Sequence, residues 1–130
     1  IIMSNFTVEI ISPAKSILKK EAREVILPSF EGEIGILKDH IPIITFLRPG
    51  IIKILSDTDQ EFFVEDGTVE FVNNNLLILT STARKLSDLK KENINLIITE
   101  TEKAINKDPL KDKEKYLLTY KLETLKNIIQ

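Results

Sequence analysis

Residues 28–50, PSFEGEIGILKDHIPIITFLRPG, decide the predicted fold, because short apolar runs alternate there with glycine and proline. The segment carries three of the chain's four glycines, three of its five prolines and its single histidine. Runs of this kind are typical of β-strands joined by shaped turns. Residues 48–51, RPGI, predict a type II turn, in which proline sets φ at the second position and glycine supplies a positive φ at the third. The charged residues between the apolar runs indicate a loop that meets a partner.

Short strands are also predicted on both sides of this segment. Residues 6–11 alternate apolar with polar side chains, which predicts a strand with one buried face. Polar turns are expected at residues 57–59 and 73–75. The remaining predicted strands are 15–20, 22–27, 51–55 and 76–80. Turns at this interval predict a β-sandwich of about ten short strands.

Residues 61–72, EFFVEDGTVEFV, contain the Asp66-Gly67 dipeptide that is preferred in a two-residue type I′ hairpin. In that register four apolar side chains point inward: Phe62, Val64, Val69 and Phe71. Phe63 is then left on the outer face among acidic residues. Two interpretations stay open for it: a scattered surface aromatic, or a side chain covered by the C-terminal segment or by a partner.

The pattern changes after Ala83, because residues 88–108 and 110–130 contain no glycine and are separated by Asp108-Pro109. Four apolar residues spaced 4, 3 and 4 apart predict one stripe of a helix: Leu118, Leu122, Leu125 and Ile129. Residues 88–108 carry a poorer stripe, and INLIIT within them is also compatible with a strand. The prediction is a mainly β protein with an α appendage: a β-sandwich of residues 1–87 and an antiparallel helical hairpin of residues 88–130, broken at Pro109.

Composition excludes several classes of function. A net charge of −2 gives no reason to expect nucleic acid as a partner, and the absence of cysteine excludes disulfides and thiolate chemistry. No run approaches the roughly 18 apolar residues of a membrane span, and no signal peptide is expected. There is no GxxxxGK[ST] phosphate loop, catalytic set or metal-ligand cluster, so neither a cofactor nor a metal is predicted. We interpret His40 as a turn or interface residue, and Glu31 and Glu33 as solvated carboxylates rather than an acid/base pair.

Several segments together carry a resemblance to a known family. EGEIGIL, the HxPxxT segment and RPG are preceded by FTVEIISP and followed by FFVEDGTVEFVNNNLLILTSTA. In this order, over residues 5–87, they resemble the epsilon chain of the bacterial F-type ATP synthase. The resemblance implies a non-catalytic central-stalk rotor subunit that joins the gamma subunit to the c-ring, peripheral on the cytoplasmic face of the inner membrane. The rival interpretations are a free-standing β-sandwich protein-binding module with a helical tail and, less favoured, a small hydrolase.

The resemblance also implies site residues. The family's ring-facing glutamate and histidine correspond to Glu33 and His40, and Asp39 replaces a small residue or glycine of the family. The full set expected at the c-ring interface is Glu31, Glu33, Gly35, Lys38 and His40.

The resemblance gives the hairpin a regulatory role. It is expected to restrain ATP hydrolysis when extended along gamma towards the catalytic alpha and beta subunits, and its basic last helix favours an acidic surface. Some family members bind ATP at a motif resembling [IL]DxxRA, to which KDKEKY is the nearest match. Asp112 and Lys115 take the acidic and basic positions, but lysine does not reproduce the bidentate grip of arginine on phosphate. Weak or absent nucleotide binding is therefore predicted.

Overall fold

The computed structural model describes residues 5–107 and 110–129. Nine of its strands have five to seven residues, and β10 has two. The strands are β1 (Phe6–Ile11), β2 (Ser16–Ala22), β3 (Glu24–Ser29), β4 (Gly32–Leu37), β5 (Ile43–Leu47), β6 (Gly50–Leu55), β7 (Gln60–Val64), β8 (Gly67–Val72), β9 (Asn75–Leu79) and β10 (Arg84–Lys85). They are followed by the short 3₁₀ helix η1 (Leu86–Asp88), then by α1 (Lys91–Ile105) and α2 (Asp112–Ile128).

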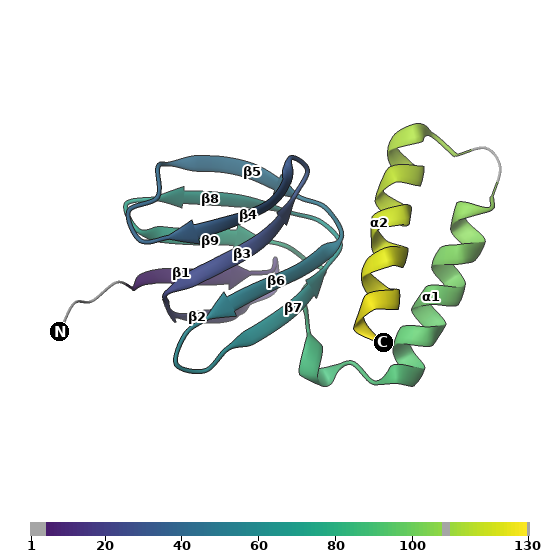
Figure 1. Ribbon diagram of the computed structural model, residues 1–130, viewed down its shortest axis with the longest axis horizontal. Coiled ribbons are helices and arrows are strands. Elements are labelled where there is room, and N and C mark those ends of the chain that lie inside the picture. The colour runs from purple at the N-terminus through teal and green to yellow at the C-terminus, as the bar shows by residue number, and fades with distance from the viewer. Residues whose placement is uncertain (1–4, 108–109, 130) are drawn as a thin grey trace.

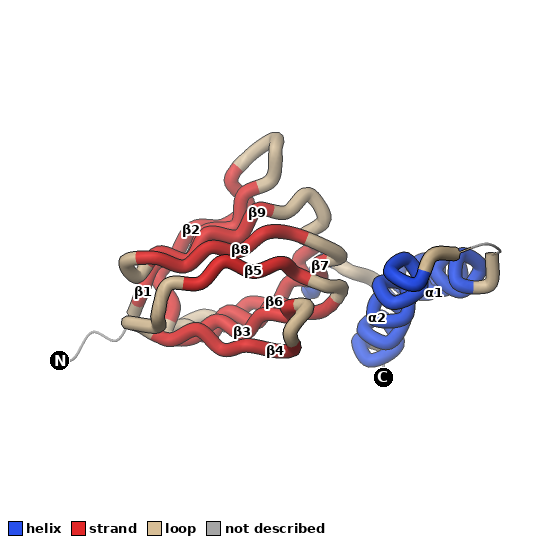
Figure 2. The backbone as a smooth tube through the Cα atoms, turned by 90° about the horizontal axis from the view of Figure 1, so that it is seen from above, coloured by secondary structure: helices blue, strands red, loops and turns tan. Residues whose placement is uncertain are grey.

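The strands form two packed layers, as predicted for a β-sandwich (Figure 1, Figure 2). One layer runs β5-β8-β9-β1-β2 and the other runs β4-β3-β6-β7-β10, and the pairing of Ser29 with Leu47 joins them into one curled sheet. All pairings are antiparallel except that of β1 with β9. Apolar side chains of both layers meet between them and exclude water, which supplies the main stabilisation of such a fold.

The predicted type II turn at RPG is wrong. β4 lines one whole edge of β3, while β5 and β6 follow each other along the other edge. The φ of Gly50 is not positive; a Cβ atom there would lie 2.5 Å from the Cβ atom of Pro28. The glycine is therefore required by a close backbone approach, at the point where one long strand bends from the first layer into the second.

The predicted Asp66-Gly67 hairpin is also wrong. β7 pairs with β6 and β10, whereas β8 pairs with β5 and β9, so the chain crosses between layers at this dipeptide. Gly67 has a φ of 155°, and a Cβ atom there would lie 2.8 Å from the carbonyl oxygen of Leu79. The predicted inward set is nevertheless correct, because alternation fixes the face of a strand without fixing its partner. The inward residues are Phe62, Val64, Val69 and Phe71.

The helical hairpin is confirmed, and INLIIT belongs to α1 rather than to a strand. Its predicted break at Asp108-Pro109 lies outside the described residues. Both helices pack side by side against one end of the sandwich, beyond the ends of β6 and β7 (Figure 1, Figure 2). At the opposite end lie the β4–β5 loop (residues 38–42) and the β8–β9 turn, where Asn73 and Asn74 have φ values of 49° and 59°.

Candidate functional site

The residues predicted for the c-ring interface lie along β4 and at its two ends. Among the described residues β4 pairs with β3 alone, so its other edge leaves backbone N–H and C=O groups unpaired. We call these five residues the β4 stripe: Glu31, Glu33, Gly35, Lys38 and His40. All are exposed except His40, which is half-buried.

The structure does not bring the two ends of the β4 stripe together. Glu31 follows Phe30, whose ring stacks on that of Tyr116 in α2 at 5.9 Å, so this end faces the hairpin. His40 lies beyond the other end of β4, beside the β8–β9 turn. A six-residue strand spans about 20 Å. Glu33 and His40 therefore do not share one end of the sandwich, and a partner that contacts both must lie along the strand.

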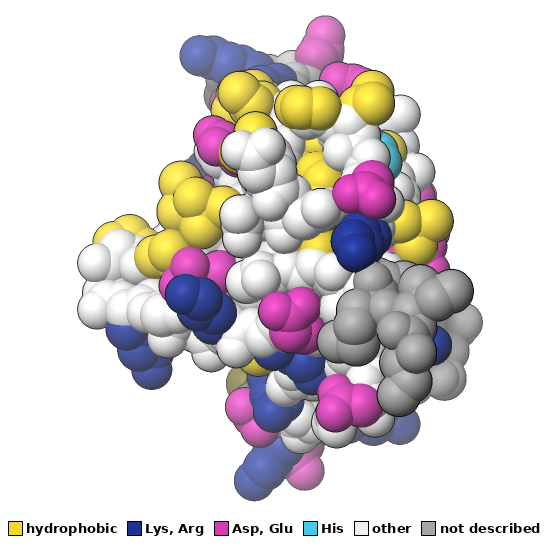
Figure 3. Space-filling model, turned by 90° about the vertical axis from the view of Figure 1, so that its left-hand side faces the viewer, with side chains coloured by type: hydrophobic (Ala, Val, Ile, Leu, Met, Phe, Trp, Pro, Cys, Tyr) yellow, Lys and Arg dark blue, Asp and Glu magenta, His cyan; other side chains and the backbone are white. Residues whose placement is uncertain are grey.

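The β4–β5 loop has a defined geometry around His40. The His40 backbone N–H donates to the Leu37 carbonyl oxygen at 3.1 Å, and Nδ1 lies 2.7 Å from the Ile41 carbonyl oxygen. The imidazole ring and the Phe71 ring form a T-shaped pair with centroids 5.9 Å apart. Asp39 has a φ of 66° and is hydrogen-bonded to Asn74. Figure 3 looks onto this end of the molecule, where acidic, basic and apolar side chains lie around a surface histidine.

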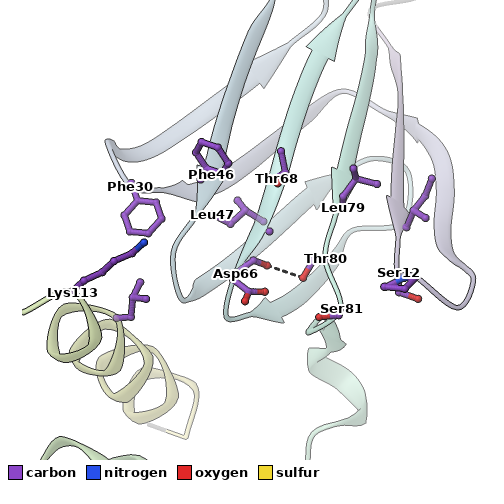
Figure 4. A pocket seen from close by; sticks show the side chains of 14 residues that line it. Ser12, Phe30, Phe46, Leu47, Asp66, Thr68, Leu79, Thr80, Ser81 and Lys113 are labelled. Carbon is purple, nitrogen blue, oxygen red and sulfur yellow. Dashed lines mark hydrogen bonds between the residues drawn. The ribbon is translucent and has the colours of Figure 1, made fainter. Parts of the chain in front are cut away.

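A second surface, which the sequence analysis did not predict, lies on the outer face of β5, β8 and β9. Ile44 is 70% exposed and Phe46 is 58% exposed, and Leu79 continues the row across β9. Next to this face, an open groove of about 1070 Å³ runs towards α2. Figure 4 shows Phe30, Phe46 and Leu79 around it, with Lys113 reaching in from α2. We call Ile44, Phe46 and Leu79 the outer apolar face.

A signal for this face was present in the sequence. Strands that are covered on one side alternate apolar with polar residues, as β1 does, whereas continuous apolar runs are typical of strands covered on both sides. LLIL in β9 is such a run, and in IITFL of β5 only Thr45 interrupts the apolar residues.

The hairpin packs on Phe63, which is fully buried. A cluster separate from the sandwich core surrounds this ring and contains Ile94 and Ile98 of α1 and Leu125 of α2. The second interpretation of Phe63 is therefore correct: the C-terminal segment covers it. Of the predicted stripe, Leu125 is buried, Leu122 and Ile129 pack at the margin of the cluster, and Leu118 is half-buried outside it.

Aromatic and charged contacts accompany this cluster. The Arg48 guanidinium lies 3.9 Å from the centre of the Tyr120 ring, and its Nε donates to the Ser29 carbonyl oxygen at 2.8 Å. Lys121 pairs with Glu65 at 2.7 Å. Partial desolvation and the neighbouring Tyr120 raise the pKa of the Tyr116 hydroxyl above its ordinary value.

The chain is similar to known proteins of one family. The family model described as the β-sandwich domain of the ATP synthase delta/epsilon chain matches residues 5–86. An ATP synthase epsilon chain from Pelagibacter ubique is 48% identical over 125 residues, which cover 95% of this chain and 96% of that one. The chain belongs to the ATP synthase epsilon chain family.

Solved structures share the fold of this epsilon-chain family member. A chain in a cryo-EM structure of the Euglena gracilis mitochondrial ATP synthase, showing OSCP, F1 and c-ring, has a TM-score of 0.81 at 17% identity and covers 100% of this chain and 84% of that chain. A chain of the Tetrahymena thermophila mitochondrial ATP synthase central stalk and c-ring has a TM-score of 0.68 at 16% identity, covering 95% and 96%. The likeness of fold therefore includes the hairpin as well as the sandwich.

The candidate nucleotide residues of this epsilon-chain family member are exposed. Asp112 and Lys115 lie in the first turns of α2, away from the Phe63 cluster. Within residues 5–107 and 110–129, no group of three or more His, Asp or Glu side chains is placed to hold a metal ion. No helix in the described part of the chain is long and apolar enough to cross a membrane.

Proposed function

We propose that this chain is a non-catalytic rotor subunit of the central stalk of a proton-translocating F-type ATP synthase, where it couples the gamma subunit to the c-ring. The observation that supports it best is the combination of two uncovered surfaces, the outer apolar face and the β4 stripe, on one rigid sandwich of the epsilon-chain family. A subunit that transmits rotation must hold two partners at once on a scaffold that does not deform.

The β4 stripe suits the polar loops of a c-ring. It presents two carboxylates, a lysine and an imidazole along and beside a strand with one unpaired edge, so a partner that lies along β4 could meet both the charged side chains and the backbone hydrogen-bonding groups of that edge. The membrane location that follows is peripheral, on the cytoplasmic face of the bacterial inner membrane.

The outer apolar face suits the gamma subunit. Ile44 and Phe46 are more than half exposed on a regular sheet, where an apolar partner would bury them. The face lies on the other layer of the sandwich from β4, so both partners fit without overlap.

The hairpin regulates the complex under this proposal. Residues 1–87 form the stalk-binding unit and residues 88–130 form a detachable unit that rests on Phe63. When it leaves this site and extends along gamma, its basic second helix meets the catalytic alpha and beta subunits and restrains ATP hydrolysis. Five basic and three acidic side chains in residues 110–130 favour an acidic target.

Cysteine cross-linking tests the two surfaces, because the chain contains no cysteine of its own. Glu33→Cys and His40→Cys should each cross-link to the c subunit in assembled enzyme, and Ile44→Cys should cross-link to gamma. Glu61→Cys, on β7, is a matched exposed control that should cross-link neither to the c subunit nor to gamma. Cross-links from positions 33 and 40 to the catalytic subunits alone would contradict the assignment.

Deletion of residues 88–130 tests the regulatory role. The truncated chain should assemble with gamma and the c-ring, and ATP hydrolysis by the complex should rise. Unchanged hydrolysis in an intact complex would mean that the hairpin does not inhibit. Failure of the truncated chain to assemble would mean that the hairpin is structural.

A further inference from the structure

We propose that Asn74 is a positioning residue for the β4–β5 loop, and that it sets the orientation in which His40 is presented to the rotor partner. The inference rests on the proposed function, because it concerns how one end of the β4 stripe is held ready for docking.

Two reciprocal hydrogen bonds join Asn74 to Asp39. The Asp39 backbone N–H donates to Asn74 Oδ1 at 2.7 Å, and Asn74 Nδ2 donates to Asp39 Oδ1 at 3.0 Å. The Asn74 carbonyl oxygen also accepts a hydrogen bond from the Thr7 backbone N–H at 3.1 Å. One residue therefore ties the β8–β9 turn to the start of β1 and to the β4–β5 loop.

The chemistry of the pair requires an amide at position 74. An asparagine side chain supplies one acceptor and one donor at fixed separation, and here each meets a different atom of the same residue. Both residues have left-handed backbones, with φ values of 66° for Asp39 and 59° for Asn74. A residue other than glycine keeps a left-handed backbone only when surrounding contacts stabilise it. The two hydrogen bonds to Asn74 supply that stabilisation for Asp39.

The Asp39–Asn74 pair also fixes the position of His40, which follows Asp39 directly. Its backbone N–H bond to Leu37 and its ring contact with Phe71 both depend on the path that the loop takes at Asp39. A loop that is already ordered loses less conformational freedom on binding, so it binds more tightly for the same contacts. The Asp39 carboxylate is engaged by Asn74, so its role is internal rather than a direct contact with the partner.

The neighbouring residue provides a matched control. Asn73 also has a left-handed backbone, with a φ of 49°, and among the described residues its side chain makes no hydrogen bond. Glycine tolerates this conformation at either position, so Asn74→Gly and Asn73→Gly are equally compatible with the turn. Asp39→Asn is a second control, because it keeps the acceptor for Asn74 Nδ2 and removes the charge.

The experiment uses the full chain in two arms. The first measures amide hydrogen exchange of Asp39 and the chemical shifts of the His40 ring in the isolated chain. The second measures the affinity of the chain for ATP synthase membranes depleted of their epsilon subunit. Asn74→Gly should speed Asp39 exchange, shift the His40 ring signals and weaken association about ten-fold, the loss expected for two hydrogen bonds. Asn73→Gly and Asp39→Asn should resemble the unchanged chain in both arms.

Three outcomes would overturn parts of the inference. Unchanged Asp39 exchange in Asn74→Gly would mean that the pair does not hold the loop. Faster exchange with unchanged association would mean that the loop's order does not matter for docking. If Asp39→Asn weakens association as much as Asn74→Gly, the carboxylate contacts the partner directly. The His40→Ala variant distinguishes failure of the proposed function from failure of this inference. If His40→Ala associates normally with the membranes, the docking role of His40 is wrong, even where Asn74→Gly speeds the exchange of the Asp39 amide.

Discussion

Replacement of Leu125 by alanine should release the hairpin from the sandwich without unfolding the sandwich. Leu125 is fully buried, and its neighbours are Phe63 of β7 and the isoleucines of α1. It takes no part in the core between the two layers. The Leu125→Ala change should therefore weaken the docking of the hairpin alone.

The magnitude follows from the cavity that the change leaves. Truncation of a buried leucine costs about 2–5 kcal/mol, from lost apolar transfer and an unfilled void. At about 1.4 kcal/mol per factor of ten, the docking equilibrium should fall about 30-fold to several thousand-fold. Leu96→Ala is the matched control, because Leu96 is 64% exposed on α1 and an exposed truncation changes stability by no more than about 0.5 kcal/mol.

Native-state hydrogen exchange on the full chain measures both variants. In Leu125→Ala the exchange protection of the α1 and α2 amides should fall about 30-fold to several thousand-fold, while the amides of β1 to β9 should keep their protection. Leu96→Ala should leave both sets close to the unchanged chain. Equal loss of protection in helices and strands would show one cooperative unit, and unchanged helix protection would show that Leu125 does not hold the hairpin; either result would refute the reasoning.

Three further predictions concern the hairpin and its candidate sites. Arg48→Lys should weaken docking by about 1 kcal/mol in the same exchange experiment, because an ammonium cannot reproduce the planar contact with Tyr120; no change would contradict this. Desolvation and Tyr120, its neighbour in α2, raise the pKa of the Tyr116 hydroxyl above its ordinary value, so Tyr116 should stay protonated at a pH where a free tyrosine ionises, as an NMR titration would show; Tyr120→Phe should lower that pKa, and an unchanged pKa would contradict this. The purified chain should not hydrolyse ATP and should bind it weakly or not at all in a calorimetric titration; a micromolar dissociation constant lost on Lys115→Ala would contradict this.

Alternation and helical spacing predicted which side chains point inward, but not which strands pair. In EFFVEDGTVEFV the inward residues were correct, whereas the hairpin was not, because turn propensity is a local property and β7 and β8 enter different layers. The type II turn predicted at RPG was wrong for the same reason. Gly50 is needed because its backbone lies close to Pro28, and no local sequence pattern shows such a contact.

The sequence also predicted only part of the candidate site. The sequence indicated a charged loop that meets a partner, whereas the structure places Glu33 on strand β4 and puts Glu31 and His40 beyond its opposite ends. Phe63 could not be assigned, because its burial depends on a segment about 30–60 residues further along the chain. The outer apolar face could have been predicted from the apolar run of β9 and from β5, where Thr45 alone interrupts the apolar residues.

The separation of the two apolar clusters would allow the hairpin to move, as the proposed function requires, while the sandwich stays rigid. The sandwich core consists of side chains from the strands, so it keeps every one of its contacts when the hairpin leaves. Removal of the hairpin uncovers Phe63 and its partly buried neighbour Ile51, a patch of a size that folded proteins tolerate. The helices have 15 and 17 residues, and helices of that length are marginal in water without a surface to pack on. We therefore expect a one-sided dependence, in which the sandwich folds without the hairpin but the hairpin needs an apolar surface. On that expectation, a partner that offers an equivalent surface would shift the hairpin's position without disturbing the sandwich that carries it.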